Sequence, residues 1–269
     1  MDVVQSSSAR SRFRVGEIRR EAPEQPDWNQ ASSSEAALRR LCLCEGLEPE
    51  ALSQLDRLIA GRVRLHRGGK VFRAGERFVA LYAIRSGSCK TISLTEGGEY
   101  QVAGYHLAGE IIGTDGIDDD RHVCEAEALE DIEVSVLPFT RLEAFGRQNA
   151  RFQHNLHRLL SREIARQGRL TLLLGTMFAE QRLAVFLLDL SERYHAGGYS
   201  SCEFLLRMTR EEIGSYLGLK LETVSRMFSR FQHDGLVQVQ GRVVKLLDRP
   251  SLKQLIESSE WRESSCRLG

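Results

Sequence analysis

Three polar residues in the last quarter of the chain have the side-chain types that read a DNA sequence: Glu222, Ser225 and Arg226. Arginine bonds the O6 and N7 atoms of guanine bidentately, glutamate accepts from the amino group of cytosine, and serine reaches either kind of base edge. Their spacing places all three on the outer face of one predicted helix. The alternative is a solvated helix face on which Glu222 and Arg226, four residues apart, form an ion pair.

Two short helices joined by a tight turn are predicted around these side chains. Thr209 and Glu212 have the spacing of a capping box at the start of the first helix, and Gly218 ends that helix where a left-handed residue is needed. The second helix turns Val224 and Phe228 inward, and its polar N-terminal end is placed to meet base edges in the major groove. The pattern predicts a helix-turn-helix.

Neighbouring features extend this motif into a DNA-binding domain. Residues 236–247, LVQVQGRVVKLL, predict two short strands that pivot on Gly241, as in the wing that commonly flanks such a motif. Eight Lys and Arg face five Asp and Glu over residues 207–249, whereas the formal charge of the whole chain is zero. A nucleic-acid partner must therefore be argued from a local surface. The residues best suited to phosphates are Thr209, Arg210, Lys220 and Thr223.

Residues 62–137 consist of short alternating or β-rich runs that glycine-containing turns such as RGGK and TEGGE interrupt. Strands and turns at this spacing predict an all-β sandwich or jelly roll. A short helix is expected before it, beginning near Pro49 and ending at Gly61.

A long helix is predicted over residues 147–177. Its apolar residues fall near steps of three and four, and Glu163 and Arg166 interrupt them: Phe152, Leu156, Leu159, Leu170 and Leu173. A helix between two domains buries such a stripe most easily against a second copy of itself, which predicts a homodimer joined along these residues. The alternative is that the stripe packs on its own barrel.

The chain of 269 residues is long enough for two compact domains with separate cores. We predict an α+β fold with the following parts: a disordered arm (1–37), a β jelly-roll sensor domain (38–146), a dimerisation helix (147–177), a winged helix-turn-helix domain (178–250) and a C-terminal tail (251–269).

Three features predict a cytoplasmic protein with no membrane partner. No apolar run approaches the roughly 20 residues that a membrane helix needs. The N-terminus lacks the apolar core and cleavage site of a secretory signal. The six cysteines are scattered rather than arranged as a disulfide framework, which suits a reducing compartment.

The chain from about Leu41 to Leu247 resembles the CRP/FNR transcription regulators, and specifically the FNR branch, named after fumarate and nitrate reduction. The most specific matches are LYAIRSGSCK, YHLAGEIIG, RLAVFLLDLSER and MTREEIGSYLGLKLETVSRMFSRF. The resemblance implies that the jelly roll is of the cyclic-nucleotide-binding type and that the E-x-x-S-R pattern reads a TTGAT-type half-site in each subunit of a homodimer. It also implies an activator of genes for low-oxygen or redox metabolism, which contacts RNA polymerase through a barrel loop with the residues Leu94, Glu96, Gly98 and Glu99.

The sequence departs from this family where oxygen is sensed. Oxygen-sensing members hold a [4Fe–4S] cluster on four cysteines, of which only Cys42 has a match; the other positions hold Ser33, Ala36 and Ser135. Cys44 and Cys124 could substitute, but their spacing is not that pattern. Gln167 stands where those members carry an acidic residue that restrains dimerisation. We therefore expect a dimer without a cluster.

Cyclic AMP is also not expected. The segment Gly109, Glu110, Ile112 and Gly113 is close to the first half of the family's nucleotide motif, which members that do not bind nucleotide share. In the second half, Arg121 is followed by His122 and Val123, and the aspartates of residues 118–120 would repel a phosphate.

A metal-dependent cupin enzyme is the alternative from a different class. Cupins need clustered histidine and glutamate ligands, whereas His66, His106 and His122 lie on separate segments. No Ser-His-Asp arrangement, H-E-x-x-H motif or phosphate loop is found either. We therefore expect neither an enzyme nor a metal site.

Overall fold

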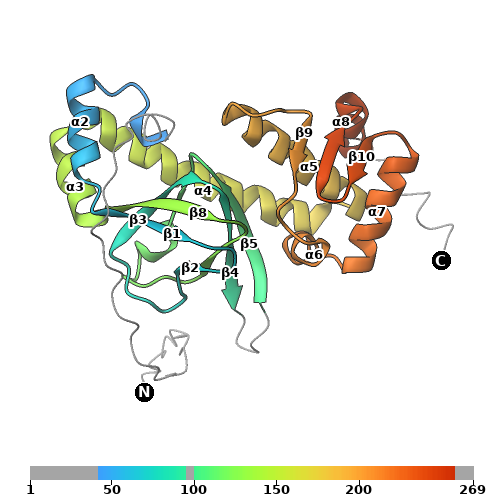
Figure 1. Cartoon of the computed structure of the whole chain (residues 1–269), viewed down its shortest axis with the longest axis horizontal. Helices are drawn as coiled ribbons and strands as arrows, with labels where there is room; N and C mark the ends of the chain where they lie inside the picture. The colour runs from blue at the N-terminus through green and yellow to red at the C-terminus, as the bar shows by residue number, and fades with distance from the viewer. Residues whose placement is uncertain (1–41, 95–99, 258–269) are drawn as a thin grey trace, which may run out of the picture.

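The computed structural model describes residues 42–94 and 100–257, and its first domain is an antiparallel β sandwich (Figure 1). One sheet has the strand order β1 (Gly61–Leu65), β8 (Ile132–Pro138), β3 (Ala80–Ser86) and β6 (Ile111–Ile112). The other has the order β2 (Lys70–Phe72), β7 (Glu125–Ala128), β4 (Ser88–Leu94) and β5 (Tyr100–Leu107). Phe72, Ile84 and Val134 are buried in the core of this domain. The predicted α+β fold with an N-terminal jelly roll is confirmed.

Short helices flank the sandwich: the 3-10 turns η1 (Cys42–Cys44) and η2 (Thr114–Gly116), and the helices α2 (Pro49–Arg57) and α3 (Phe139–Gln148). The predicted start of α2 at Pro49 is correct, but its predicted end is wrong. The helix ends at Arg57, and Gly61 is already the first residue of β1, where it pairs with Val136.

The long helix α4 (Ala150–Thr176) begins after Asn149, whose side chain accepts a hydrogen bond from the Phe152 amide at 2.9 Å. Asn149 also separates α4 from α3, so the predicted helix of residues 147–177 begins in the last turn of α3. Figure 1 shows α4 running from α2 and α3 at one end of the molecule to the C-terminal domain at the other. No helix of the described residues is long and apolar enough to span a membrane.

The C-terminal domain combines four helices with a small sheet. The helices are α5 (Ala179–Ala196), α6 (Arg210–Leu217), α7 (Leu221–His233) and α8 (Arg249–Glu257). The sheet has the order β10 (Val237–Gln240), β11 (Val243–Leu246) and β9 (Glu203–Leu205). The predicted wing corresponds to β10 and β11. The prediction of a tail from residue 251 is wrong as far as residue 257, because Leu252 and Leu255 of α8 are buried in the core of this domain. Residues 1–41 and 258–269 lie outside the described chain.

Candidate nucleic-acid interface

The turn between α6 and α7 has the geometry that the sequence predicts. The Thr209 hydroxyl accepts from the Glu212 amide at 3.1 Å, and the Glu212 carboxylate accepts from the Thr209 amide at 2.6 Å, which completes the capping box. Gly218 follows α6 in the left-handed conformation, with a φ of 63°. Gly214 is required for close packing, because a Cβ there would lie 2.5 Å from the Leu219 carbonyl oxygen.

Helix α7 has one buried and one exposed face. Val224, Met227, Phe228 and Phe231 are buried in the domain core. Glu222 and Arg226 are exposed and Ser225 is half-buried, so the predicted base-reading residues lie on the solvent side near the start of the helix. Arg230, one turn after Arg226, is the arginine that pairs with Glu180 at 3.2 Å and with Asp234 at 3.7 Å.

The four residues predicted to contact phosphates have different surroundings. Lys220 is exposed immediately before α7, and Thr223 is half-buried in its first turn. Thr209 is exposed, with its hydroxyl engaged in the capping box. The guanidinium of Arg210 instead lies 3.4 Å from the centre of the Phe228 ring, and burial lowers the pKa of Arg210. The structure therefore gives Arg210 a packing role that its sequence position did not reveal.

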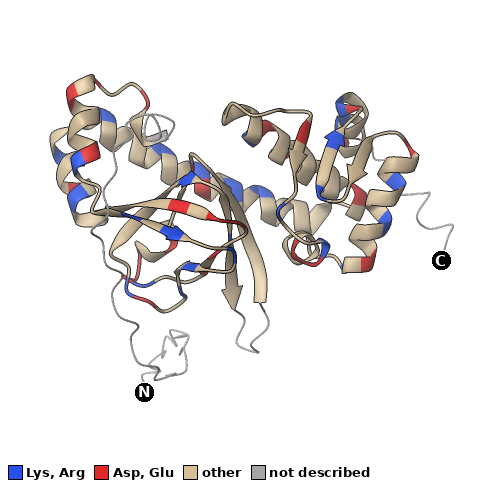
Figure 2. Cartoon of the chain, viewed as in Figure 1, with Lys and Arg blue, Asp and Glu red and all other residues tan. Residues whose placement is uncertain are grey.

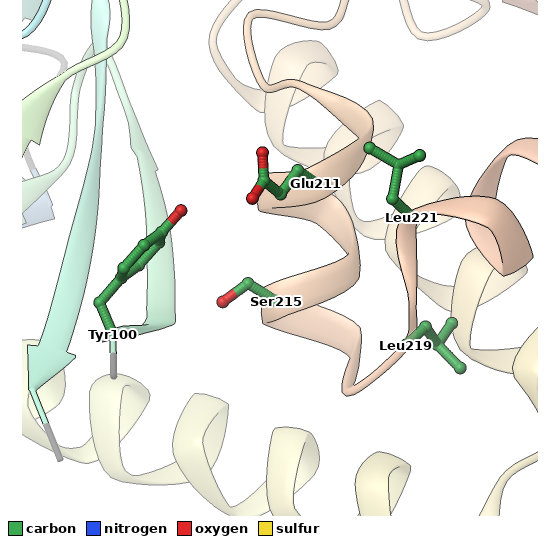
Figure 3. Close-up of a pocket in the computed structure, with 5 residues that line it drawn as sticks. All are labelled: Tyr100, Glu211, Ser215, Leu219 and Leu221. Carbon is green, nitrogen blue, oxygen red and sulfur yellow. The ribbon is translucent and has the colours of Figure 1, made fainter. Parts of the chain in front are cut away.

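An open cleft of about 380 Å³ leaves the start of α7 accessible beside the barrel. Figure 3 shows Tyr100 of β5 on one side of the cleft and Glu211 and Ser215 of α6 on the other, with Leu221 beyond them. Leu221 is 44% exposed, and an exposed apolar side chain is of the type that can contact the methyl group of thymine. Leu221 precedes the buried Val224 by three residues, so its sequence position placed it on the predicted inner face and gave no sign of this exposure.

Contacts between the two domains lie near the cleft. Lys90 of β4 pairs with Glu212 of α6 at 2.5 Å and with Glu127 of β7 at 3.0 Å. Burial alone would lower the pKa of Lys90, but its bonds to Glu212 and Glu127 raise it. The Val102 amide of β5 donates to the Ser215 hydroxyl at 2.9 Å. These contacts join segments far apart in the chain, and sequence spacing gave no signal for them.

The carboxylate of Glu110, in the nucleotide-type motif, is held by the protein itself. It accepts hydrogen bonds from Arg193 of α5 at 2.9 and 2.8 Å and lies 3.6 Å from Arg166 of α4. Burial alone would raise the pKa of Glu110, but these guanidinium groups hold it at about 2. Arg121, in the second half of the motif, donates to the Gly75 carbonyl at 2.8 Å. Both side chains of this motif are therefore bound to groups of their own chain.

Three of the described thiols are buried, and they lie in two separate places. Cys44 is buried in an apolar cluster beside α2 and α3, whereas Cys89 and Cys124 are buried inside the sandwich. Burial raises the pKa of the Cys89 and Cys124 thiols, which opposes the thiolate form that iron needs. Within residues 42–94 and 100–257, no group of three or more His, Cys, Asp or Glu side chains could hold a metal ion. Ser33, Ala36 and the side chain of Cys42 lie outside the described part of the chain.

Most of the apolar residues predicted for the dimer interface face their own chain. Phe152 and Leu156 are buried against the barrel-side helices with Leu159 packed beside them, and Leu173 and Leu170 pack in the C-terminal core. That burial follows from the ends of α4 lying against the two domains.

The middle of α4 leaves a different apolar face exposed. Ile164 is 73% and Leu172 59% exposed, and the space beside Gly168 between them is open. The steps of four from 164 to 168 to 172 place these residues on one side of the helix.

In the predicted polymerase loop, Leu94 is exposed; Glu96, Gly98 and Glu99 lie outside the described residues.

Comparison with known proteins supplies independent information. A Crp-like helix-turn-helix domain matches residues 181–255, and a cyclic nucleotide-binding domain matches residues 62–149. The chain is 46% identical to the transcriptional regulatory protein btr of Bordetella pertussis, over 89% of this chain and 98% of that protein. It is 42% identical to the transcriptional activator protein anr of Pseudomonas aeruginosa, over 81% and 90% of the two chains. The solved structure of FixK2 from Bradyrhizobium japonicum is similar, with a TM-score of 0.68 at 27% identity over 74% of this chain and 98% of that one.

Proposed function

Because this chain belongs to the CRP/FNR family of transcription regulators, we propose that it binds a two-fold-symmetric DNA site as a homodimer and reads a TTGAT-type half-site with α7 of each subunit. The protein is a DNA-binding regulator of the FNR type and not an enzyme. The observation that carries the proposal is the exposed polar face at the start of α7, opposite its buried apolar face.

Base readout is assigned to Glu222, Ser225 and Arg226, as the sequence predicts. To these we add Leu221, whose exposed side chain suits a thymine methyl group. Lys220 is assigned to the phosphates on charge and position. Figure 2 shows that α7 carries both basic and acidic residues, so the contact is a local arrangement of single side chains rather than a broad basic surface.

The dimer is assigned to the exposed middle of α4, with Ile164, Gly168 and Leu172 at its centre. This replaces the interface first predicted from the sequence, because Phe152, Leu156 and Leu173 are already buried in their own chain. Two copies of α4 joined along this face would bury the apolar side chains that one copy leaves in water. A two-fold axis along the same face would relate the two α7 helices, as a palindromic site requires.

We further propose that the protein activates genes of low-oxygen or redox metabolism by contacting RNA polymerase through the loop that follows Leu94. The name of the Pseudomonas aeruginosa relative as a transcriptional activator supports activation. Leu94 is 56% exposed at the end of β4, where a partner can reach it.

DNA binding is proposed to need neither an iron–sulfur cluster nor a cyclic nucleotide. A [4Fe–4S] cluster needs four thiolates, whereas Cys44, Cys89 and Cys124 are buried in two separate apolar clusters. The carboxylate of Glu110 is already paired with Arg193. Fluorescence anisotropy with protein purified in air, freed of iron by chelation and mixed with a TTGAT–ATCAA duplex should therefore detect specific binding, unchanged by added cyclic AMP.

The same assay tests the reading residues. Arg226→Ala should cost about 1–3 kcal/mol of specific binding and relax the preference at one guanine, whereas Lys220→Ala should weaken all sequences about equally. Unchanged affinity of Arg226→Ala for the palindrome would contradict the readout. Stoichiometric iron in anaerobically purified protein, with DNA binding that is lost as the cluster absorption is lost, would contradict the cofactor-free proposal.

A further inference from the structure

The ends of three helices meet at Arg182, in the first turn of α5. Its Nη2 donates to the Leu174 carbonyl at 2.8 Å and its Nε donates to the Met177 carbonyl at 2.9 Å, so it covers the C-terminal end of α4. Its Nη1 donates to the carbonyl of Leu217, the last residue of α6, at 3.0 Å. One guanidinium group therefore joins the last turn of α4 to the end of α6.

The chemistry of these positions explains why an arginine occupies this place. The last carbonyl groups of a helix have no partner within the helix, and a cation near them is favourable. A helix junction with carbonyls at several angles needs donors spread over a rigid fork, which arginine has and lysine lacks. The packing around the fork is close: a Cβ on Gly218 would lie 3.2 Å from Leu174 and 3.3 Å from the Nη1 of Arg182.

The position of this junction along the chain gives it a specific consequence. Helix α6 is held to the barrel through Glu212, near its N-terminal end, and to α4 through Leu217, at its C-terminal end. Only residues 218–220 separate that C-terminal end from the first residue of α7. A rotation of α6 against α4 at this end would therefore move the start of α7 directly.

We propose that Arg182 is a positioning residue that transmits the orientation of the dimer helix α4 to the reading helix α7, and so sets the distance between half-sites that the dimer accepts. The inference rests on the proposed binding of a palindrome by a homodimer. Half-sites in such complexes are centred about one helical turn apart, roughly 34–36 Å. One extra base pair moves a half-site by about 3.4 Å and turns it by roughly a tenth of a turn, which a rigid pair of reading helices rejects.

The test measures half-site spacing preference. Wild-type protein, Arg182→Gln and Arg182→Lys are titrated by fluorescence anisotropy against palindromes of the preferred spacer and against spacers one base pair shorter and longer. Titration of a duplex with one half-site reports the affinity for a single site, and light scattering reports the dimer mass. Arg147→Gln, which removes an exposed arginine from the end of α3, is the matched control.

The wild type and Arg147→Gln should bind the palindrome with the preferred spacer at least about tenfold more tightly than the palindromes with the other spacers, because the second half-site binds intramolecularly only when the geometry permits. In Arg182→Gln that ratio should fall to about threefold or less, with the half-site affinity and the dimer mass unchanged, and Arg182→Lys should lie between. If Arg182→Gln does not fold, the ratio for Arg182→Lys decides.

Two further results are distinguishable. Wild-type protein that binds no palindrome, or binds all spacers equally, overturns the proposed dimeric reading and this inference with it. Wild-type protein with a sharp spacer preference that the folded Arg182 variants keep unchanged leaves the proposed function intact and overturns the role of Arg182.

Discussion

Replacing Ile164 and Leu172 together by Asp should convert the proposed dimer into folded monomers. The two side chains are 73% and 59% exposed in the single chain, and full burial of a Leu or Ile side chain contributes about 1.5–3 kcal/mol. Scaled by these exposed fractions and counted for both copies, their burial contributes about 4–8 kcal/mol to the dimer. The dissociation constant of the double variant should therefore rise at least about a thousandfold.

Sedimentation equilibrium over a range of concentrations measures this change, and thermal melting of the monomer checks the fold. The matched comparison is Leu156→Asp, on the same helix but buried in its own chain, which should lower the melting temperature instead. The proposed interface is refuted if the Ile164 and Leu172 double variant is dimeric at the same protein concentrations as the wild type. It is equally refuted if Leu156→Asp gives a folded monomer of unchanged melting temperature.

Three other substitutions have distinct expected results. Arg210→Ala should lower the free energy of unfolding by about 1 kcal/mol in urea titrations, because it removes the cation over the Phe228 ring. An unchanged free energy of unfolding would contradict this packing role and leave only the predicted contact of Arg210 with a phosphate. Glu110→Gln should lower the free energy of unfolding by about 1.5–3 kcal/mol at neutral pH, because it removes the carboxylate that accepts two hydrogen bonds from the buried Arg193 and leaves Asp189 as the remaining carboxylate partner. The pKa of Glu110 is about 2 against an ordinary 4.5, so its contribution is present above about pH 4.5 and is lost as the pH falls towards 2; a difference between variant and wild type that does not shrink over that window would contradict the pairing. Leu221→Ala should weaken binding to the half-site about threefold and remove the wild type's preference for thymine over uracil at one position, measured by anisotropy; a preference that persists would exclude the methyl contact.

The helix-turn-helix was predictable because its determinants are local. The capping box of Thr209 and Glu212 and the left-handed Gly218 act within one or two turns of chain, so their spacing in the sequence is also their spacing in space. The same applies to the wing, where Gly241 has a φ of 59° between two strands in register. The exposed positions of Glu222 and Arg226 followed from these boundaries.

The partner of an apolar stripe was not predictable in the same way. Periodicity shows that Phe152 and Leu173 face something apolar, but not whether it is a second copy or the domain at that end of the helix. Ile164 and Leu172 gave a weaker signal, because Gly168 stands between them where a larger apolar residue would have continued the stripe. The pair of Glu110 and Arg193 joins positions 83 residues apart, and no rule of spacing connects them.

The contacts around α6 bear on how such a regulator could act without a ligand. At one end of the helix, Glu212 both caps the helix and pairs with Lys90 of the barrel. At the other end, Arg182 ties Leu217 to the last turn of α4. A ligand shifts an equilibrium only when it binds two arrangements of the protein with different affinity. Here the side chains that such a ligand would engage, above all Glu110, already bind the C-terminal domain through Arg193. If the protein binds DNA without a cofactor, as proposed, its activity would be controlled through the amount of protein rather than through a ligand at Glu110.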